Sequence, residues 1–237
     1  MPSIQISEER GVRQLHFGGD YIQGAMRIAR PWALELEYTR DMMLPLLLRD
    51  EAWPATVLQV GLGAASVTKF LYRHRPHARL TVVEIEPQVV RTARDCFRLP
   101  EDPGRIHIEI GDGYEYMGAR RARFDLVAVD GYDEKGRAGM LDTEPFYHQC
   151  RERLAKDGLL VVNLLTRRRK AEPSLQRLRA AFGGHVLEIP PGEAGNLVAV
   201  AGRRAFALDF EELRGAARRL KASTGLNLLP AVARLQG

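Results

Sequence analysis

Acidic side chains follow three successive apolar runs of the sequence, at the point where each run ends. Glu84 closes the run LTVVE, Asp112 follows RIHIEI inside a Gly-Asp-Gly turn that ends at Gly113, and Asp130 follows FDLVAV. At the end of a buried strand, the carboxylate of Glu84 can accept hydrogen bonds from the two ribose hydroxyls, and that of Asp112 from an adenine amino group. Together these acids predict a pocket for an adenosine.

A Gly-x-Gly turn at Gly61 and Gly63 precedes these acids and lies between the run VLQV and a helix-length segment. Such a turn lets the backbone approach a ligand closely, and the N-terminus of the following helix supplies free N–H groups. The same turn also serves helix–strand packing, so it becomes specific only together with the acids. Ser66 stands where a nicotinamide dinucleotide-binding turn usually has its third glycine, which favours a nucleoside without a pyrophosphate.

Asp130 and Asp133 lie three residues apart on a loop that begins at the same edge of the predicted sheet. The pair suits transfer of a group to an amine, because a primary amine with a pKa of about 10.4 is almost wholly protonated at neutral pH and cannot attack. One carboxylate can remove the proton while the other holds the remaining cationic part of the substrate. An adenosyl sulfonium donor would leave as a neutral thioether, so no general acid is needed and positioning supplies much of the acceleration.

The segments that must position these residues alternate between strand-length apolar runs and helix-length amphipathic stretches from Val57 onward. This alternation predicts an α/β fold: a Rossmann-like, doubly wound, parallel sheet with helices on both faces. The runs LTVVEI, FDLVAVD and GLLVVNLL are apolar on both faces and are expected to be its central strands. The runs HVLEI and LVAVAG, joined by IPPGEAGN, are expected to form an antiparallel edge.

The N-terminal residues have a different pattern, and we divide the chain after residue 33. Residues 1–33 are expected to form a short β-hairpin region, with VRQLHFGG and YIQGAMRIA turning around the Gly18-Gly19 pair. Residues 34–237 are expected to form one nucleoside-binding catalytic domain, which opens with a helix over about 33–48. The segment DFEELRGAARRLKAST starts with an Asp cap, has apolar residues at helical spacing, and predicts a closing helix.

The charge, the apolar segments and the cysteines of the sequence indicate where the protein is located and which partners it has. The 237 residues carry a net charge of +5, and a general preference for arginine explains this excess more simply than a nucleic-acid partner does. No segment approaches the roughly 20 apolar residues of a membrane span, and the N-terminus lacks the pattern of a signal peptide. We therefore expect a cytoplasmic protein with no membrane partner. Two isolated cysteines predict neither a disulfide nor a metal site.

From Gln23 to Gly195 the sequence resembles the spermidine synthase family, the polyamine aminopropyltransferases. The resemblance rests on Val83-Glu84-Ile85-Glu86 in the second strand, Gly111-Asp112-Gly113 after the third, and the aspartate-rich loop Asp130-Gly131-Tyr132-Asp133 after the fourth. The segment LELEYTRDMML resembles the family's DEFIYHEML, with Glu35 and Tyr38 on its acid and tyrosine. The run TEPFYHQCRERLAKDGLLVVN resembles the helix and strand that follow the loop. The loop is the most specific of these elements.

The resemblance implies the sheet type of the class I S-adenosylmethionine-dependent methyltransferases and a role for each site residue. Glu84 would hold the ribose and Asp112 the adenine of decarboxylated S-adenosylmethionine, which would be a co-substrate rather than a prosthetic group. Asp130 would accept the proton of the attacking amine. Asp133, Tyr38 and Gln23 would bind that acceptor, an amine such as putrescine. The family also implies a homodimer.

The sequence departs from the family at four places. Ala64 stands where the family's glycine-rich turn has the aspartate that pairs with the donor's aminopropyl ammonium. Thr39 and Arg40 replace a polar residue and an acid after the tyrosine, and Ile189 replaces an aromatic wall of the polyamine tunnel. The N-terminal strand domain is shorter and leaves no clear counterpart of the family's first glutamine. These changes leave the identity of the donor and of the acceptor open.

Three hypotheses for the activity follow. The leading one is transfer of an aminopropyl group from decarboxylated S-adenosylmethionine to an amine. The alternative is a methyltransferase that uses S-adenosylmethionine itself, because Ala64 removes a repelling carboxylate, and Arg40 or the run 167–170 could attract the carboxylate of the donor. The third is a non-catalytic relative that binds a nucleoside or a polyamine. Retention of both Asp130 and Asp133 argues against it, since a binding module needs no proton acceptor.

Overall fold

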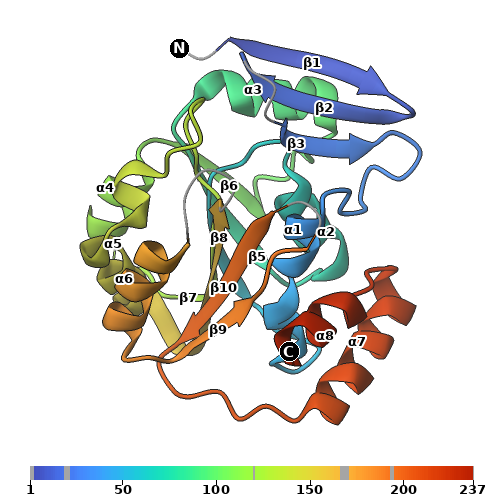
Figure 1. The fold of residues 1–237 in the computed structure, drawn as a ribbon. Helices are drawn as coiled ribbons and strands as arrows, with labels where there is room; N and C mark the ends of the chain where they lie inside the picture. The colour runs from blue at the N-terminus through green and yellow to red at the C-terminus, as the bar shows by residue number, and fades with distance from the viewer. Residues whose placement is uncertain (1–2, 19–21, 120, 166–170, 193–194, 237) are drawn as a thin grey trace.

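The computed structural model describes residues 3–18, 22–119, 121–165, 171–192 and 195–236, and two β-sheets organise them (Figure 1). The larger sheet has seven strands in the order β6-β5-β4-β7-β8-β10-β9. These strands are β4 (Thr56–Val60), β5 (Arg79–Glu84), β6 (Ile106–Ile110), β7 (Phe124–Val129), β8 (Leu154–Leu165), β9 (Val186–Ile189) and β10 (Asn196–Gly202). Strands β4 to β8 pair in parallel, whereas β10 is antiparallel to β8 and to β9. The predicted Rossmann-like sheet and its antiparallel edge are confirmed.

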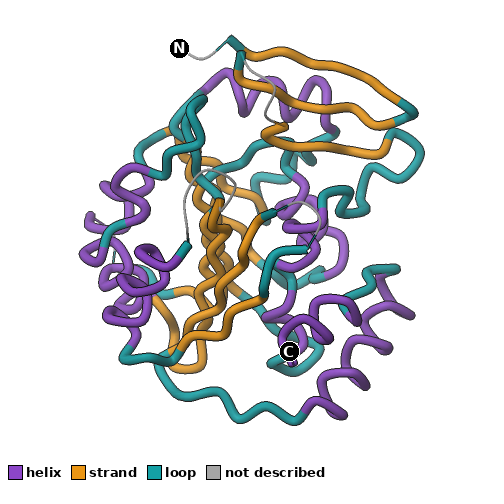
Figure 2. The backbone as a smooth tube through the Cα atoms, viewed as in Figure 1, coloured by secondary structure: helices purple, strands orange, loops and turns teal. Residues whose placement is uncertain are grey.

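Helices cover both faces of this sheet (Figure 2). One face packs against α2 (Ser66–His74), α3 (Pro87–Phe97), α7 (Phe210–Thr224) and α8 (Leu229–Gln236). The other packs against α4 (Gly113–Ala119), α5 (Glu144–Arg153) and α6 (Glu172–Phe182). Consecutive side chains of β8 pack on opposite faces of the sheet: Val161 packs on the face with α2, α7 and α8, and Leu160 packs on the face with α5 and α6. Burial on both faces explains why the central strands are continuous apolar runs.

The parallel strands bring their carboxyl ends to one edge of the sheet. The glycine turn at Gly61 follows β4, Glu84 ends β5, Asp112 follows β6, and Asp130 follows β7. In doubly wound sheets ligands bind outside this edge, where the order of the strands reverses. The order β6-β5-β4-β7-β8 reverses between β4 and β7, so Gly61 and Asp130 flank that point.

A smaller antiparallel sheet at the N-terminus contains three strands in the order β1-β2-β3 (Ile4–Glu9, Val12–Phe17 and Ile22–Arg27). Strands β2 and β3 form the predicted hairpin, although Gly19 lies outside the described residues. Strand β1 was not predicted, because almost all its side chains are exposed and its sequence has little apolar pattern. The sheet packs through Leu15 and Met26 against Phe97 of α3 and Ala64 of the glycine turn.

The predicted helix over 33–48 is wrong in length. The structure has a short α1 (Glu37–Asp41) followed by a 3₁₀ turn, Leu44–Leu47. Pro45 lies at the start of that turn, and a proline has no N–H group to continue an α-helical hydrogen-bond ladder. The closing helix is confirmed as α7, but the short α8 after it was not predicted. The division of the chain after residue 33 stays a prediction.

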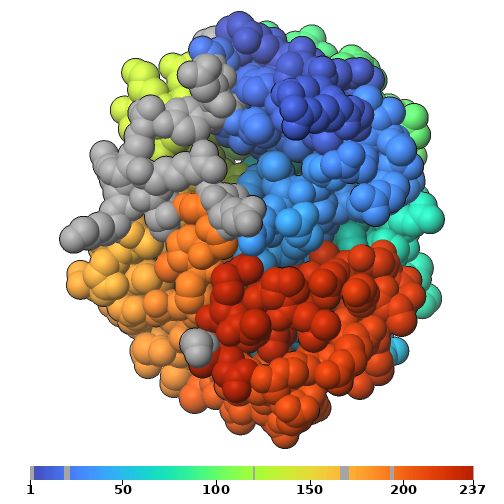
Figure 3. Space-filling model, turned by 45° about the vertical axis from the view of Figure 1, so that its right-hand side comes forward, coloured from blue at the N-terminus to red at the C-terminus, as the bar shows by residue number. Residues whose placement is uncertain are grey.

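The N-terminal strands and the C-terminal helices occupy different parts of the surface. Figure 3 shows the N-terminal strands in dark blue at the top of one face and the C-terminal helices α7 and α8 in red across its lower part. Among the described residues, none of the helices combines the length and the apolar character that a membrane-spanning segment requires. Helix α8 is tied to α1 through Arg234, which pairs with Glu37 and with Asp41.

Candidate active site

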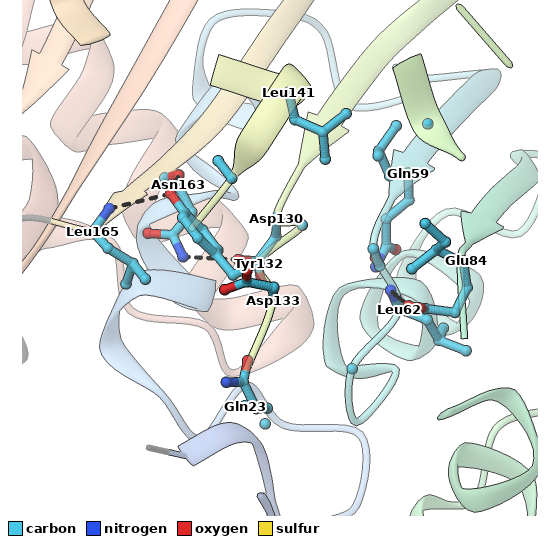
Figure 4. A pocket seen from close by; sticks show the side chains of 18 of the residues that line it. Gln23, Gln59, Leu62, Glu84, Asp130, Tyr132, Asp133, Leu141, Asn163 and Leu165 are labelled. Atoms are coloured by element: carbon cyan, nitrogen blue, oxygen red, sulfur yellow. Dashed lines mark hydrogen bonds between the residues drawn. The ribbon is translucent and has the colours of Figure 1, made fainter. Parts of the chain in front are cut away.

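A cavity of about 750 Å³ lies at the carboxyl edge of the larger sheet and is closed from the N-terminal side by β3 and α1. All nine residues predicted for the site line it: Gln23, Tyr38, Gly61, Gly63, Glu84, Asp112, Gly113, Asp130 and Asp133. Figure 4 shows Asp130, Tyr132, Asp133 and Asn163 grouped on one side of the cavity and Glu84 with Leu62 on the other. The structure therefore brings the predicted residues together, while the role of each stays a prediction.

Glu84 is tied to the glycine turn. Its two carboxylate oxygens accept hydrogen bonds from the backbone N–H groups of Leu62, at 2.8 Å, and of Glu86, at 3.0 Å. Burial raises the pKa of Glu84, and these backbone donors partly offset the effect of burial. A buried carboxylate held at the mouth of the turn is suited to accept hydrogen bonds from paired hydroxyls.

The turn also brings the ends of β4 and β7 into contact. Gly61 has a φ of +87°, and a Cβ atom there would lie 2.1 Å from the carbonyl oxygen of Asp130. Only glycine combines this backbone conformation with so close an approach. Gly61, which opens the predicted donor site, is therefore in direct backbone contact with Asp130, the predicted proton acceptor.

Asp112 serves the fold as well as the cavity. Its Oδ1 accepts hydrogen bonds from the N–H groups of Tyr114, at 2.7 Å, and Glu115, at 3.2 Å, and so caps the N-terminus of α4. A Cβ atom on the adjacent Gly113 would lie 2.4 Å from Cγ1 of Val60. The capping bonds fix the direction of the carboxylate at the side of the cavity where the adenine was predicted.

Asp130 is held by two neutral donors. Its Oδ1 accepts a hydrogen bond of 2.8 Å from Nδ2 of Asn163, and the hydroxyl of Tyr38 donates a second one. Burial raises the pKa of Asp130, and the two hydrogen bonds oppose this rise. Burial, and then the charge of Asp130, raise the pKa of Tyr38, so its phenol keeps its proton and remains a donor. This environment makes Asp130 a stronger proton acceptor than an exposed aspartate.

The carboxylate of Asp133 accepts hydrogen bonds from other residues of its own loop. Oδ2 accepts a hydrogen bond of 2.7 Å from Nε of Arg137, and Oδ1 accepts from the N–H groups of Lys135 and Arg137 at 2.8 and 2.9 Å. Burial acts to raise the pKa of Asp133, but these donors outweigh it and the pKa is lowered. The Arg137 guanidinium therefore occupies Oδ2 of Asp133 in this structure.

Sequence reasoning predicted Tyr38 but missed Asn163, the other side chain that donates to Asp130. Asn163 on β8 is 2% exposed, and its side chain also accepts a hydrogen bond of 2.9 Å from Nδ2 of Asn196 on β10. The hydroxyl of Tyr132 donates to the backbone oxygen of Asn163, at 2.5 Å, and accepts from the N–H group of Leu165. The signal for Asn163 was present, because it is the one polar residue inside the apolar run LLVVNLL.

The positions that depart from the family differ in their relation to the cavity. Ala64 lines it but is 2% exposed, because the backbone of Gly24 in β3 packs against it. Arg40 donates to the carbonyl oxygens of Leu34 and Glu35 and is not among the described residues that line the cavity. Ile189 is fully buried in the core. The run 167–170 lies outside the described residues.

The sheet order, the glycine turn and the acids after β5, β6 and β7 define a class of protein: a Rossmann-like α/β domain with a cavity at the carboxyl edge of its sheet. Residues 35–169 match the spermine/spermidine synthase domain. A polyamine aminopropyltransferase of Chromobacterium violaceum is 36% identical over 237 residues, which cover 100% of this chain and 90% of the relative. This chain belongs to the spermine/spermidine synthase family.

Solved structures agree with the fold. A probable spermidine synthase from Corynebacterium glutamicum has a TM-score of 0.76 at 22% identity, with 93% of this chain and 84% of that chain covered. Human methyltransferase-like protein 13, in complex with SAH, has a TM-score of 0.70 at 21% identity, with 80% and 93% covered. The predicted likeness to both kinds of enzyme is therefore confirmed at the level of the fold.

Proposed function

We propose that this chain is a transferase that moves an aminopropyl group from decarboxylated S-adenosylmethionine to an amine such as putrescine, a step of polyamine biosynthesis. Family membership supports this proposal, and so does one feature of the cavity. Asp130, with its raised pKa, lies in backbone contact with the glycine turn that also binds Glu84. A proton acceptor is thus placed beside the predicted donor site.

The reaction follows from the placement of these groups. Glu84 accepts hydrogen bonds from the ribose hydroxyls and Asp112 accepts one from the adenine amino group, which turns the sulfonium side of the donor toward Asp130. Asp130 takes a proton from the acceptor ammonium, and the freed amine attacks the aminopropyl carbon next to sulfur. The C–N bond forms as the C–S bond breaks. The electron pair of the C–S bond stays on sulfur, and the leaving group is neutral methylthioadenosine.

Tyr38, Gln23 and Asp133 are proposed to bind the acceptor. Tyr38 donates to Asp130, so it fixes the carboxylate toward which the amine must point. Gln23 comes from β3, the strand that closes the cavity. The carboxylate of Asp133 becomes available when Arg137 moves away from it. A diamine would then have one amino group at Asp130 and the other at Asp133.

Ala64 favours a second candidate, a methyltransferase that uses S-adenosylmethionine. No carboxylate stands at this position to pair with the ammonium of an aminopropyl group or to repel the carboxylate of a methionine group. Arg40 no longer supports the candidate, because its guanidinium is bound to backbone carbonyls. Among the described residues that line the cavity, Lys135 is a cation that could attract a carboxylate, whereas the guanidinium of Arg137 is paired with Asp133.

A product assay separates these functions. The purified chain is incubated with putrescine and either donor, and products are identified by mass spectrometry. Methylthioadenosine and spermidine in equal amounts from the decarboxylated donor support the proposal. A methylated amine and S-adenosylhomocysteine from the other donor would establish the methyltransferase instead. Nucleoside binding without any product would fit the non-catalytic hypothesis.

The setting of the activity is part of the proposal. We expect a small-molecule amine as the acceptor, a homodimer as the assembly and the cytoplasm as the compartment, as the resemblance and the composition predict. A nucleic-acid partner is not expected.

A further inference from the structure

A chain of three polar side chains leads from the edge of the cavity to Asp130. Nδ2 of Asn196 donates to Oδ1 of Asn163 at 2.9 Å, and Nδ2 of Asn163 donates to Oδ1 of Asp130 at 2.8 Å. Strand pairing sets this arrangement, because Val198 of β10 is opposite Asn163 of β8. Asn196 is two residues from Val198 and so projects on the same face of the sheet.

Chemistry fixes the direction of both amides. A carboxylate can only accept hydrogen bonds, so Asn163 must turn its NH₂ group toward Asp130. The carbonyl oxygen of Asn163 then faces Asn196 and requires a donor, because Asn163 is almost completely buried. Asn196 supplies that donor only when its own NH₂ group points toward Asn163. The orientation of the amide beside Asp130 therefore depends on Asn196.

We propose that Asn196 is a positioning residue for Asp130 that acts through the side chain of Asn163. The reactive role of Asp130 in this inference rests on the proposed function. Asn196 prevents the amide of Asn163 from turning over and presenting its oxygen to Asp130. With the amide turned over, two acceptors would face each other unless Asp130 were protonated, and a protonated Asp130 cannot accept a proton from the substrate.

Several other ionisable groups line the cavity near Asp130. Those that line the cavity within the described residues are Tyr38 of α1, Glu84 at the end of β5, Asp112 after β6, and the loop residues Asp133, Lys135 and Arg137. Tyr132 of the same loop also lines the cavity and bonds to the backbone of β8. Asn196 carries no charge, so its replacement by leucine adds no new Coulombic interaction.

The test is a titration of Asp130 by ¹³C NMR in protein labelled at the aspartate carboxyl carbons, with Asp130→Asn used to assign the signal. Asn196→Leu should raise the pKa of Asp130 by about one pH unit, as expected for the loss of a hydrogen bond to a charged group. Asn227→Leu is the control, because Asn227 lies in the turn before α8 and bonds to the backbone of Leu229. It should leave the pKa of Asp130 unchanged.

The result that would overturn the inference is a pKa of Asp130 in Asn196→Leu equal to that of the unmodified protein. If this variant fails to fold, as judged by circular dichroism, Asn196→Ala is titrated instead, with the same two outcomes. The acid limb of kcat/KM for aminopropyl transfer should move in the same direction, while nucleoside affinity changes less than about twofold. Absence of product from the unmodified protein would contradict the proposed function, and the NMR titration would still decide the role of Asn196.

Discussion

The contact between the glycine turn and the Asp130 loop can be tested by replacing Gly61 with alanine. The φ of +87° costs an L-residue about 1 to 2 kcal/mol. The new Cβ atom would lie 2.1 Å from the carbonyl oxygen of Asp130, so β7 or the turn must move, and such overpacking costs about 1 to 3 kcal/mol. We expect the free energy of unfolding to fall by about 2 to 5 kcal/mol.

A matched control separates backbone strain from steric overlap. Gly225 has a φ of +79°, and a Cβ atom there would meet no atom within 4 Å. Gly225→Ala should therefore lose only the strain, about 1 to 2 kcal/mol. Urea denaturation followed by tryptophan fluorescence measures both variants, and calorimetry with methylthioadenosine should show at least tenfold weaker binding for Gly61→Ala alone. Equal losses of stability with unchanged nucleoside affinity would refute the contact between Gly61 and Asp130.

Three further predictions concern charged groups. Arg234→Leu should lower the free energy of unfolding in urea by about 2 to 4 kcal/mol, because it removes the guanidinium that pairs with the buried carboxylate of Asp41. A loss below about 0.5 kcal/mol would show that this pair is not stabilising. Burial raises the pKa of Asp41 from 3.8 to about 6, so the folded state binds this proton more tightly than the unfolded state does. The free energy of unfolding should therefore fall by about 2 kcal/mol between pH 4 and pH 6. Asp41→Asn should remove this part of the pH dependence, and an unaltered slope would contradict the prediction. Glu84→Gln should weaken nucleoside binding in calorimetry by about 1 to 3 kcal/mol, because the NH₂ group of glutamine cannot accept a hydrogen bond from the ribose or from the backbone of Leu62. Unchanged affinity would remove Glu84 from the site.

Much of the fold and the location of the site followed from patterns that are local in the sequence. Strands β5, β7 and β8 are buried between two layers of helices, so apolar side chains occupy both of their faces and the strands could be recognised as central. Glu84 and Asp130 stand where such runs end. Because parallel strands present these ends at one edge, the residues could be placed in one cavity before the structure was known.

The remaining features depend on contacts between distant segments or on the conformation of a loop. Ala64 is buried because Gly24, forty residues earlier, lies against it, and no local pattern reports that contact. Arg137 reaches Asp133 because the intervening Gly136 adopts a φ of +70° and folds the loop back. Strand β1 is almost wholly exposed, and Ile4 and Ile6 are its only apolar residues, which is too short a pattern to mark a strand. Ala64 and the loop from Asp133 to Arg137 line the cavity, so contacts that no local pattern reports shape the space for the donor and the acceptor.

The most direct test of the proposed mechanism is the single-turnover rate of aminopropyl transfer in Asp130→Asn at saturating decarboxylated donor. The substitution keeps an oxygen that can accept from Asn163 and removes the proton acceptor. The rate should fall by about 10² to 10⁴, the range for loss of a general base, while nucleoside affinity stays the same. A rate within about tenfold of the unmodified protein, or an equal loss of rate and nucleoside affinity, would contradict the role of Asp130 as the base.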